Sequence, residues 1–280
     1  MRFVRYRARE TGGFGTIVAD TIRPIIGAKT LVEAWLAQAE DAFAEPIPIA
    51  DATLECPVFP LVRNPFCVGW NYVDHFAEGA AVRGPTDAQE LPDRPTFFTK
   101  ATTAITGPND RIAAHSAVTE TLDWEVELAV IIGTRATDVP EDGAMDVVLG
   151  FTVANDVSAR NVQRGHGGQW FRGKSLDDTS PIGPWVVTGD EMGPIGGQEI
   201  LCRVNGELVQ SATLADLHFG VPRIIAELSN GMTLLPGDVI LTGTPSGVGF
   251  ARTPPRFLRP GDIVESEVAG IGTLRNQVGE

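Results

Sequence analysis

The stretch Leu122–Gly133, LDWEVELAVIIG, decides the fold because apolar residues alternate with Glu125 and Glu127 before the run becomes wholly apolar. A period of two is typical of a β-strand, so both carboxylates point to one face, about 7 Å apart. Buried charges persist only when they are paired or bound to a metal ion. The stretch therefore predicts a buried strand with a cation above it, although alone it also fits a half-exposed strand with a solvated acidic face.

A second apolar run supplies a third carboxylate. Val147–Ala154 reads VVLGFTVA and is followed by Asp156, so an aspartate emerges where a second strand ends. Three carboxylates without a histidine form an oxygen-only ligand set, which favours Mg²⁺ or Mn²⁺ over zinc or copper. In a crystal, such an oxygen-only ligand set also accepts Ca²⁺. Glu125, Glu127 and Asp156 are therefore the predicted metal ligands.

Four further residues carry candidate chemistry. His75 and Glu78 lie three residues apart, neighbours on one face of a helix, where a carboxylate orients an imidazole for activating water. Such a pair is also common as a surface contact. Lys174 stands among glycine and aromatic residues and is a candidate for stabilising an oxyanion, or a solvated loop lysine. Thr244 lies in a Gly-Thr-Pro turn and is predicted to face the substrate.

Composition and charge narrow the class of protein. The 280 residues include 31 Gly and 20 Pro, which indicates many short strands joined by tight turns and excludes a helical bundle. A formal net charge of −14 argues against nucleic-acid and membrane-surface partners. Three cysteines without a C-x-x-C pair predict buried free thiols. No stretch has the length of a membrane span or a signal peptide, so we expect a cytoplasmic protein.

The chain divides into two predicted parts. Residues 1–57 form a small N-terminal α+β subdomain, with a hairpin sheet over about 1–27, an amphipathic helix over 30–43 and a proline-rich linker from Pro46. Residues 58–280 form the main domain. Within it, Val221–Asn230 is predicted to be a short helix, because it has an early proline and a glycine after its end. Pro-Gly-Asp precedes two further apolar runs and indicates a turn that feeds a strand.

Seven ordered blocks resemble the fumarylacetoacetate hydrolase superfamily. They are VGWNYVDHFAEG (68–79), TFFTKATTAITGP (96–108), LDWEVELAVIIG (122–133), ANDVSARNVQ (154–163), GQWFRGKSLDDTSPIGP (168–184), LLPGDVILTGTPSGVG (234–249) and LRPGDIVESEVAGIGTLRNQV (258–278). The resemblance implies a mainly β fold, a β-roll of curved mixed sheets with few short helices. It also implies a homodimer and a small-molecule α-keto acid as substrate.

Matched position by position, the resemblance assigns roles. It makes the three carboxylates metal ligands, and it implies that His75, Glu78, Lys174 and Gln163 are catalytic and that Arg160, Thr244 and Tyr72 bind substrate. Two positions depart from the pattern. His218 stands where relatives usually carry an aliphatic residue, and it is a candidate for a packing or interface histidine or for a specificity role. Trp70 stands where relatives carry a smaller apolar residue, and we expect it to narrow the pocket.

The leading hypothesis is a metal-dependent hydrolase that cleaves a carbon–carbon bond of an acylpyruvate or fumarylpyruvate, giving pyruvate and a carboxylic acid. An alternative of the same family is an oxaloacetate-type β-keto acid decarboxylase or an enol–keto isomerase or hydratase, which needs the metal but no hydrolytic water. A second alternative is a non-catalytic metal-binding scaffold. Arg83, Arg160 and Arg172 are candidates for binding a second substrate carboxylate.

Overall fold

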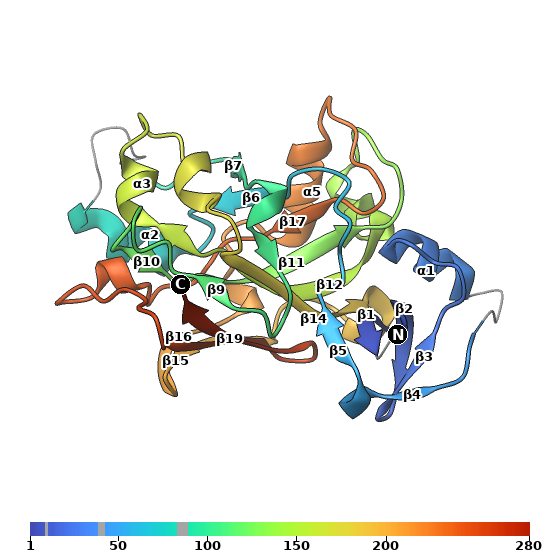
Figure 1. Cartoon of the computed structure of the whole chain (residues 1–280). Helices are drawn as coiled ribbons and strands as arrows, with labels where there is room; N and C mark the ends of the chain where they lie inside the picture. Colours follow the sequence, from blue (N-terminus) through green and yellow to red (C-terminus); the bar gives the residue numbers. More distant parts are fainter. Residues whose placement is uncertain (9–10, 39–42, 83–88) are drawn as a thin grey trace.

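The computed structural model describes residues 1–8, 11–38, 43–82 and 89–280 (Figure 1). Twelve strands of this part of the chain form one large sheet, with the main order β4-β3-β2-β1-β14-β12-β11-β17-β6-β7 and with β5 on β1 and β8 on β14. These strands are β1 (Arg2–Ala8), β2 (Thr11–Val18), β3 (Thr21–Pro24), β4 (Ile47–Pro48), β5 (Thr53–Glu55), β6 (Phe66–Gly69), β7 (Thr96–Thr99), β8 (Ile105–Thr106), β11 (Val126–Ile132), β12 (Val148–Asn155), β14 (Ser180–Thr188) and β17 (Val239–Leu241).

A second sheet has the order β16-β15-β18-β19-β9, and β10 pairs with β13 on its own. Their bounds are β9 (Ile112–Ala113), β10 (Leu122–Asp123), β13 (Ser158–Ala159), β15 (Glu199–Val204), β16 (Glu207–Thr213), β18 (Ile263–Val268) and β19 (Gly272–Gly279). The helices are short: α1 (Leu31–Ala37), α2 (Val73–Glu78), α3 (Arg160–Arg164), α4 (Gly189–Met192) and α5 (Val221–Ser229), with 3₁₀ turns that include η6 (Phe171–Lys174) and η8 (Gly249–Ala251). The predicted mainly β fold with mixed sheets and few short helices is confirmed.

Strand β11 lies in the middle of the large sheet and positions the candidate site. It pairs antiparallel with β12 on one edge and with β17 on the other, and all seven of its residues are buried. Such a strand needs apolar side chains on both faces, which the run AVIIG supplies. The predicted buried strand is therefore present, but it begins at Val126. Glu125 lies just before it, because its backbone N–H donates to the Asn155 side chain (2.9 Å) instead of continuing the ladder.

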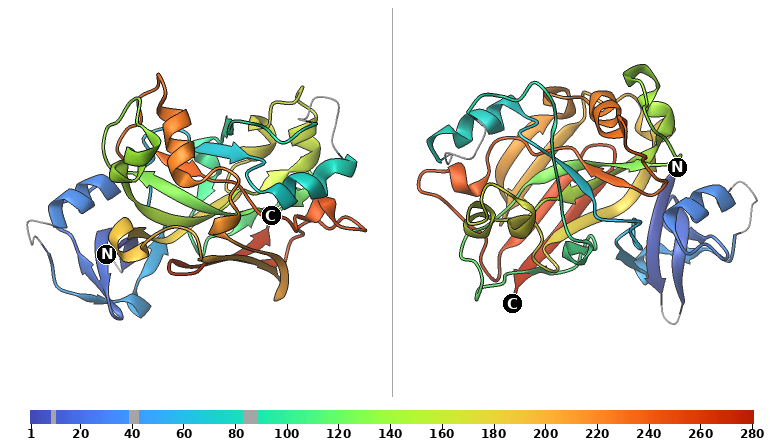
Figure 2. Two further views of the ribbon diagram at one scale, coloured as in Figure 1. Left: turned by 180° about the vertical axis from the view of Figure 1, so that it is seen from behind. Right: turned by 90° about the horizontal axis from the view of Figure 1, so that it is seen from above.

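The main hydrophobic core lies between the large sheet and the five-stranded sheet (Figure 2). One buried cluster joins Leu128 of β11 and Phe151 of β12 to Cys202 of β15 and Leu274 of β19. Helix α5, predicted from its early proline and following glycine, buries Ile224 in the same cluster. Each sheet therefore has one face covered by the other, which is the reason for the alternating burial along β18 and β19.

The N-terminal residues form the predicted hairpin sheet and helix. Strands β1, β2 and β3 pair antiparallel, and α1 ends at Ala37, with Thr30 accepting a hydrogen bond from the Glu33 N–H at its start. Strand β1 also pairs with β14, so the large sheet runs without a break from the N-terminal residues into the main domain. The division at residues 57 and 58 stays a prediction.

The proline-rich stretch after Pro46 differs from the predicted linker. Thr53–Glu55 forms β5, which pairs with β1. These three residues lie between prolines, so their N–H groups are free to join a ladder. A proline-rich segment thus contributes an edge strand, a position that sheets tolerate next to proline.

Two other expectations concern thiols and membranes. The cysteines Cys56, Cys67 and Cys202 are all buried and free, as the sequence predicted. Burial raises the pKa of the Cys56 thiol to about 12, which keeps it protonated and unreactive at neutral pH. Within the described residues, no helix has both the length and the apolar character that crossing a membrane requires.

Gly150 tests the close approach of β12 and β14. A Cβ at this position would lie 2.3 Å from the Val187 carbonyl oxygen, so Gly150→Ala should force the two backbones apart and destabilise the protein by about 1–3 kcal/mol. Gly197→Ala, which adds a Cβ in open space, is the matched control. Urea unfolding of both variants checks this, and equal stabilities would contradict the tight pairing of β12 with β14.

Candidate active site

The ladder between β11 and β12 brings three carboxylates together. Glu127 is opposite Ala154 in the register, and the Asp156 N–H donates to the Glu125 carbonyl (2.8 Å) just beyond the paired residues. One carboxylate oxygen from each of Glu125, Glu127 and Asp156 lies within 4.8 Å of the others, and all three side chains are buried. We call these residues the carboxylate cluster. It is the predicted set of metal ligands.

Two buried lysines compensate two members of the cluster. The Lys174 ammonium, on η6, lies 2.7 Å from a Glu125 oxygen and 2.5 Å from an Asp156 oxygen. The Lys100 ammonium, directly after β7, lies 2.6 Å from the other Asp156 oxygen and donates to the Val157 carbonyl at 3.2 Å. Burial alone lowers the pKa of Lys174, but Asp156 and Glu125 outweigh it and raise the pKa above its usual value. Lys174 therefore places an ammonium donor inside the site.

Glu127 is the member of the cluster that the lysines do not contact. Its side chain accepts a hydrogen bond from the Gly243 N–H (2.6 Å). Burial, and then the charges of Asp156 and Glu125, raise the pKa of the Glu127 carboxyl well above its usual value. A divalent cation would supply the positive charge that this carboxylate lacks. Buried carboxylate oxygens are also the ligands of hard cations, so the residues fit such an ion.

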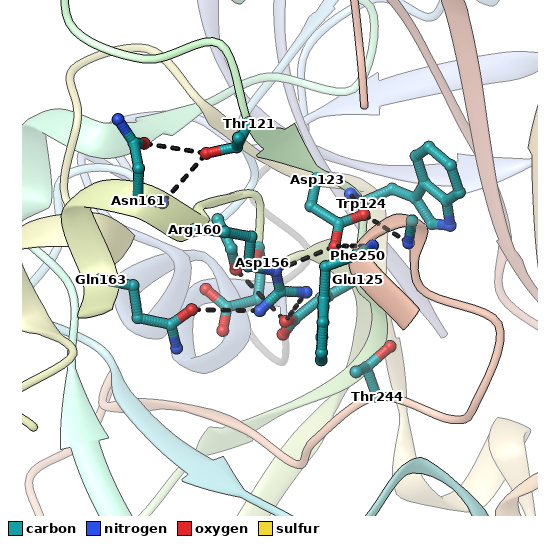
Figure 3. Close-up of polar contacts among 12 residues, drawn as sticks. Thr121, Asp123, Trp124, Glu125, Asp156, Arg160, Asn161, Gln163, Thr244 and Phe250 are labelled. Atoms are coloured by element: carbon teal, nitrogen blue, oxygen red, sulfur yellow. Dashed lines mark hydrogen bonds and ion pairs between the residues drawn. The ribbon is translucent and has the colours of Figure 1, made fainter. Parts of the chain in front are cut away.

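Arg160, at the start of α3, is held from several sides (Figure 3). Its Nε donates to Asp123 (2.9 Å), another guanidinium nitrogen lies 2.6 Å from Glu125, and a third donates to the Gln163 side chain (3.2 Å). The ring of Phe250 lies 4.4 Å from the guanidinium carbon. A guanidinium fixed on both its edge and its face has one orientation, which is the requirement for recognising a planar anion.

His75 and Glu78 are on α2, so the segment is helical, which is the condition for the two side chains to be neighbours. His75 Nδ1 lies 2.7 Å from one Glu78 oxygen, and the other oxygen accepts from the Gly247 N–H (2.8 Å). Burial acts to raise the pKa of Glu125, but Lys174, Arg160 and His75 outweigh it and hold the pKa below its usual range. The His75 ring lies 6.5 Å from the ring of Phe250, which also packs on the Arg160 guanidinium, so α2 lies beside the site.

Tyr72 and Thr244 lie at the same site. The Tyr72 hydroxyl is buried without a hydrogen-bond partner among the described residues, and burial followed by the charge of Glu127 raises its pKa. Thr244 accepts a hydrogen bond from the Gln210 side chain (2.8 Å). A buried hydroxyl without a partner is costly, so Tyr72 is placed to donate to a bound molecule. Its role in binding substrate stays a prediction, as does that of Thr244.

The candidate arginines for a second substrate carboxylate differ in position. Arg160 is buried within the site, Arg172 is exposed on η6, and Arg83 lies outside the described residues. Of the two arginines that the structure describes, Arg160 contacts the carboxylate cluster.

Lys100 and Asp123 are buried site residues that the sequence analysis did not single out. Asp123 accepts hydrogen bonds from the backbone N–H groups of Gly249 (2.7 Å) and Phe250 (3.1 Å), besides pairing with Arg160. The sequence pattern could have indicated Asp123, because this residue precedes Glu125 and Glu127 at the same spacing of two. Lys100 had a weaker signal, a lysine at the end of the short strand TFFT.

Residues 64–279 match the family profile described as Fumarylacetoacetate (FAA) hydrolase C-terminal. The chain belongs to the fumarylacetoacetate hydrolase family. The solved fumarylacetoacetate hydrolase of the psychrophile Exiguobacterium antarcticum agrees with this assignment, with a TM-score of 0.86, 36% identity and coverage of 100% of this chain and 99% of the other. The fold and family that the sequence blocks implied are therefore confirmed, and the chain is an enzyme of this family.

Two curated relatives in the fumarylacetoacetate hydrolase family carry a specific name. Oxaloacetate tautomerase YisK of Bacillus subtilis is 43% identical over 231 residues, covering 82% of this chain and 74% of its own length. The mitochondrial oxaloacetate tautomerase FAHD2A of Homo sapiens is 40% identical over 297 residues, covering 99% of this chain and 91% of its own length. These names match the alternative function more closely than the leading hydrolase hypothesis.

Divalent cations should stabilise the folded protein through the carboxylate cluster. We expect Mg²⁺ or Mn²⁺ to raise the melting temperature of metal-stripped protein, because a ligand at 100 times its dissociation constant adds about 2.7 kcal/mol. Glu127→Gln should reduce this shift strongly, whereas the exposed Glu120→Gln should retain it. Differential scanning fluorimetry with each ion checks this, and equal shifts in both variants would place the ion elsewhere.

Lys100 should contribute to stability as well as to the charge of the site. Lys100→Met leaves Asp156 with one ammonium partner in a fully buried position and should cost about 3–5 kcal/mol. Lys29→Met, at an exposed lysine, should change stability by less than about 0.5 kcal/mol. Urea unfolding of the metal-free proteins measures both, and a loss below about 1 kcal/mol at Lys100 would refute a charge-compensating role.

Proposed function

We propose that this enzyme catalyses keto–enol tautomerisation of a short 2-oxo dicarboxylic acid of the oxaloacetate type, with Mg²⁺ or Mn²⁺ at the carboxylate cluster. The observation that carries the proposal is the Lys174 ammonium, buried 2.7 Å and 2.5 Å from two of the three carboxylates. It places a hydrogen-bond donor beside the position at which the oxygen of a bound keto acid would become negatively charged. The names of the two tautomerase relatives, which match most of this chain, support the same reaction.

Tautomerisation requires few catalytic groups in a site. One proton leaves carbon 3 and another joins the oxygen on carbon 2, while the carbon skeleton stays intact and no water is consumed. The site needs a base for the carbon-bound proton, a donor for the oxygen and an orientation that keeps both in reach. A bound divalent cation supplies polarisation of the 2-oxo group and its neighbouring carboxylate.

Lys174 and Arg160 serve the anionic side of this reaction. The Lys174 ammonium, held by Glu125 and Asp156, is the hydrogen-bond donor to the enolate oxygen. Arg160 is oriented by Asp123 and by the ring of Phe250. It binds a substrate carboxylate, since a fixed guanidinium presents a planar pair of donors.

His75 is the proposed base. Glu78 accepts the hydrogen bond from Nδ1, so that nitrogen carries the proton and the neutral ring keeps its lone pair on Nε2. The Gly247 N–H holds the second Glu78 oxygen and thereby fixes the pair. Nε2 takes the proton from carbon 3 and returns it in the reverse direction. The Gln163 side chain accepts a hydrogen bond from Arg160 and so helps to orient the guanidinium.

One observation favours the acylpyruvate hydrolase as a second candidate. The His75–Glu78 contact of 2.7 Å is also the arrangement that activates water for attack on a carbonyl. Decarboxylation of oxaloacetate would need the same stabilised enolate and no water. Both fit the carboxylate cluster, whereas a non-catalytic scaffold gives no reason for an imidazole oriented by a carboxylate. A homodimer, which the family resemblance implies, stays a prediction.

The products separate these reactions. Metal-stripped enzyme should regain activity with Mg²⁺ or Mn²⁺ and speed the loss of enol absorbance from freshly dissolved oxaloacetate, without releasing pyruvate. His75→Ala should lower kcat by about 10²–10⁴-fold because it removes the base, and Glu125→Ala should abolish the effect of the metal. His166→Ala, at an exposed histidine, is the control. Metal-dependent pyruvate release from acylpyruvates without any tautomerisation would replace this proposal by the hydrolase.

A further inference from the structure

Four aromatic side chains form a continuous series of edge contacts beside the candidate site. The ring centroids of Phe76 and Trp70 lie 6.2 Å apart, those of Trp70 and Trp170 4.6 Å apart, and those of Trp170 and Phe98 5.2 Å apart. All three pairs have T-shaped geometry, which is a favourable arrangement for aromatic rings. We call these four residues the aromatic arc.

One end of the arc contacts Lys174, and the other end is on the helix that carries His75. The Lys174 ammonium lies 5.2 Å from the centroid of Phe98, and Phe76 follows His75 directly on α2. The rings come from β7, from the junction of β6 with α2 and from the segment between α3 and η6, which lie at the same end of the molecule (Figures 1 and 2). The arc therefore spans the distance between the proposed oxyanion donor and the helix of the proposed base.

Core packing does not explain the arc. The hydrophobic clusters of the described residues include Phe98 only at their edge, and they include none of Trp70, Phe76 and Trp170. All four rings are half-buried, whereas Trp124 is completely buried in the main core. Partly exposed aromatic groups gathered beside polar groups are typical of a binding pocket.

The backbone at Trp70 carries strain that its packing maintains. Its φ is +55°, in the left-handed region, which is uncommon for a bulky side chain. The preceding residue is Gly69, where a Cβ would lie only 2.2 Å from the Trp170 ring. The chain thus bends closely around Trp170 and presents the Trp70 ring at its edge. Backbone strain of this kind persists where the surrounding structure imposes it, and it is concentrated at functional sites.

We propose that Trp70 limits substrate size as part of a wall that the aromatic arc forms beside Lys174. This inference rests on the proposed function. Asn71, the residue after Trp70, packs against Gly243, whose N–H binds Glu127. The ring centroid of Phe98, at the end of the arc, lies 5.2 Å from the Lys174 ammonium. A 2-oxo acid bound beside Lys174 therefore has its carbon 3 substituent next to the arc. The wall of the arc accepts a substituent as small as a carboxylate and excludes one as large as a phenyl ring. The enzyme is therefore selective for short 2-oxo dicarboxylic acids.

Oxaloacetate and phenylpyruvate test this size limit, because both are 2-oxo acids that enolise and they differ in the carbon 3 substituent. With the Mg²⁺-loaded enzyme we expect Trp70→Gly, which also suits the positive φ, to raise the ratio of kcat/KM for phenylpyruvate to that for oxaloacetate by about tenfold or more. Trp70→Leu should shift the ratio in the same direction. Trp35→Leu, at a tryptophan on α1, is the matched control and should leave it unchanged.

A binding measurement separates failure of this inference from failure of the proposed function. Calorimetry should show that oxalate, which has no carbon 3 substituent, binds the unchanged enzyme and Trp70→Gly equally, whereas phenylpyruvate binds the variant more tightly. Equal phenylpyruvate binding by both proteins, or weaker binding by the variant, would overturn the role of Trp70. Absence of oxaloacetate turnover by the unchanged enzyme would refute the proposed function, while the calorimetric comparison would still decide the size limit.

Discussion

The burial of three carboxylates within 4.8 Å of one another is the constraint on which the rest of this structure depends. Such a cluster is unstable unless positive charge surrounds it. The chain supplies that charge from Lys100 after β7, Lys174 on η6 and Arg160 on α3. These cations come from distant parts of the sequence, so the cluster links the segments that surround the active site.

The sheets bury the carboxylate cluster and determine its geometry. Strand β11 has all its residues buried and has neighbours on both edges, which leaves water no route to the cluster through the sheet. The register of β11 and β12 then determines that Glu127 and Asp156 emerge on adjacent strands. Glu127 forms no ion pair with either lysine, and that imbalance of charge is what fits the site to a divalent cation.

Two sets of contacts orient the groups that surround the cluster. Asp123 holds Arg160 and also binds the backbone of Gly249 and Phe250, while Glu78 holds His75 and binds the backbone of Gly247. The loop between β17 and η8 is thus a common support for the arginine and for helix α2. On the other side, the aromatic arc connects the same helix to the lysine. The groups proposed to act on the substrate are therefore held from two directions rather than by α2 alone.

The sequence by itself determined a buried strand through Glu127, helix α5, the set of three carboxylates and the family, because each depends on residue spacing within a short segment or on ordered blocks. The tertiary structure alone decided that Lys100 faces Asp156, that Asp123 orients Arg160, and that residues 53–55 join the large sheet. These contacts join residues 37 or more positions apart, and local periodicity contains no information about which distant side chains meet. The aromatic arc is also a feature that only the tertiary structure decided. Its rings are visible in the sequence, but their contact follows from the bend at Gly69 around Trp170.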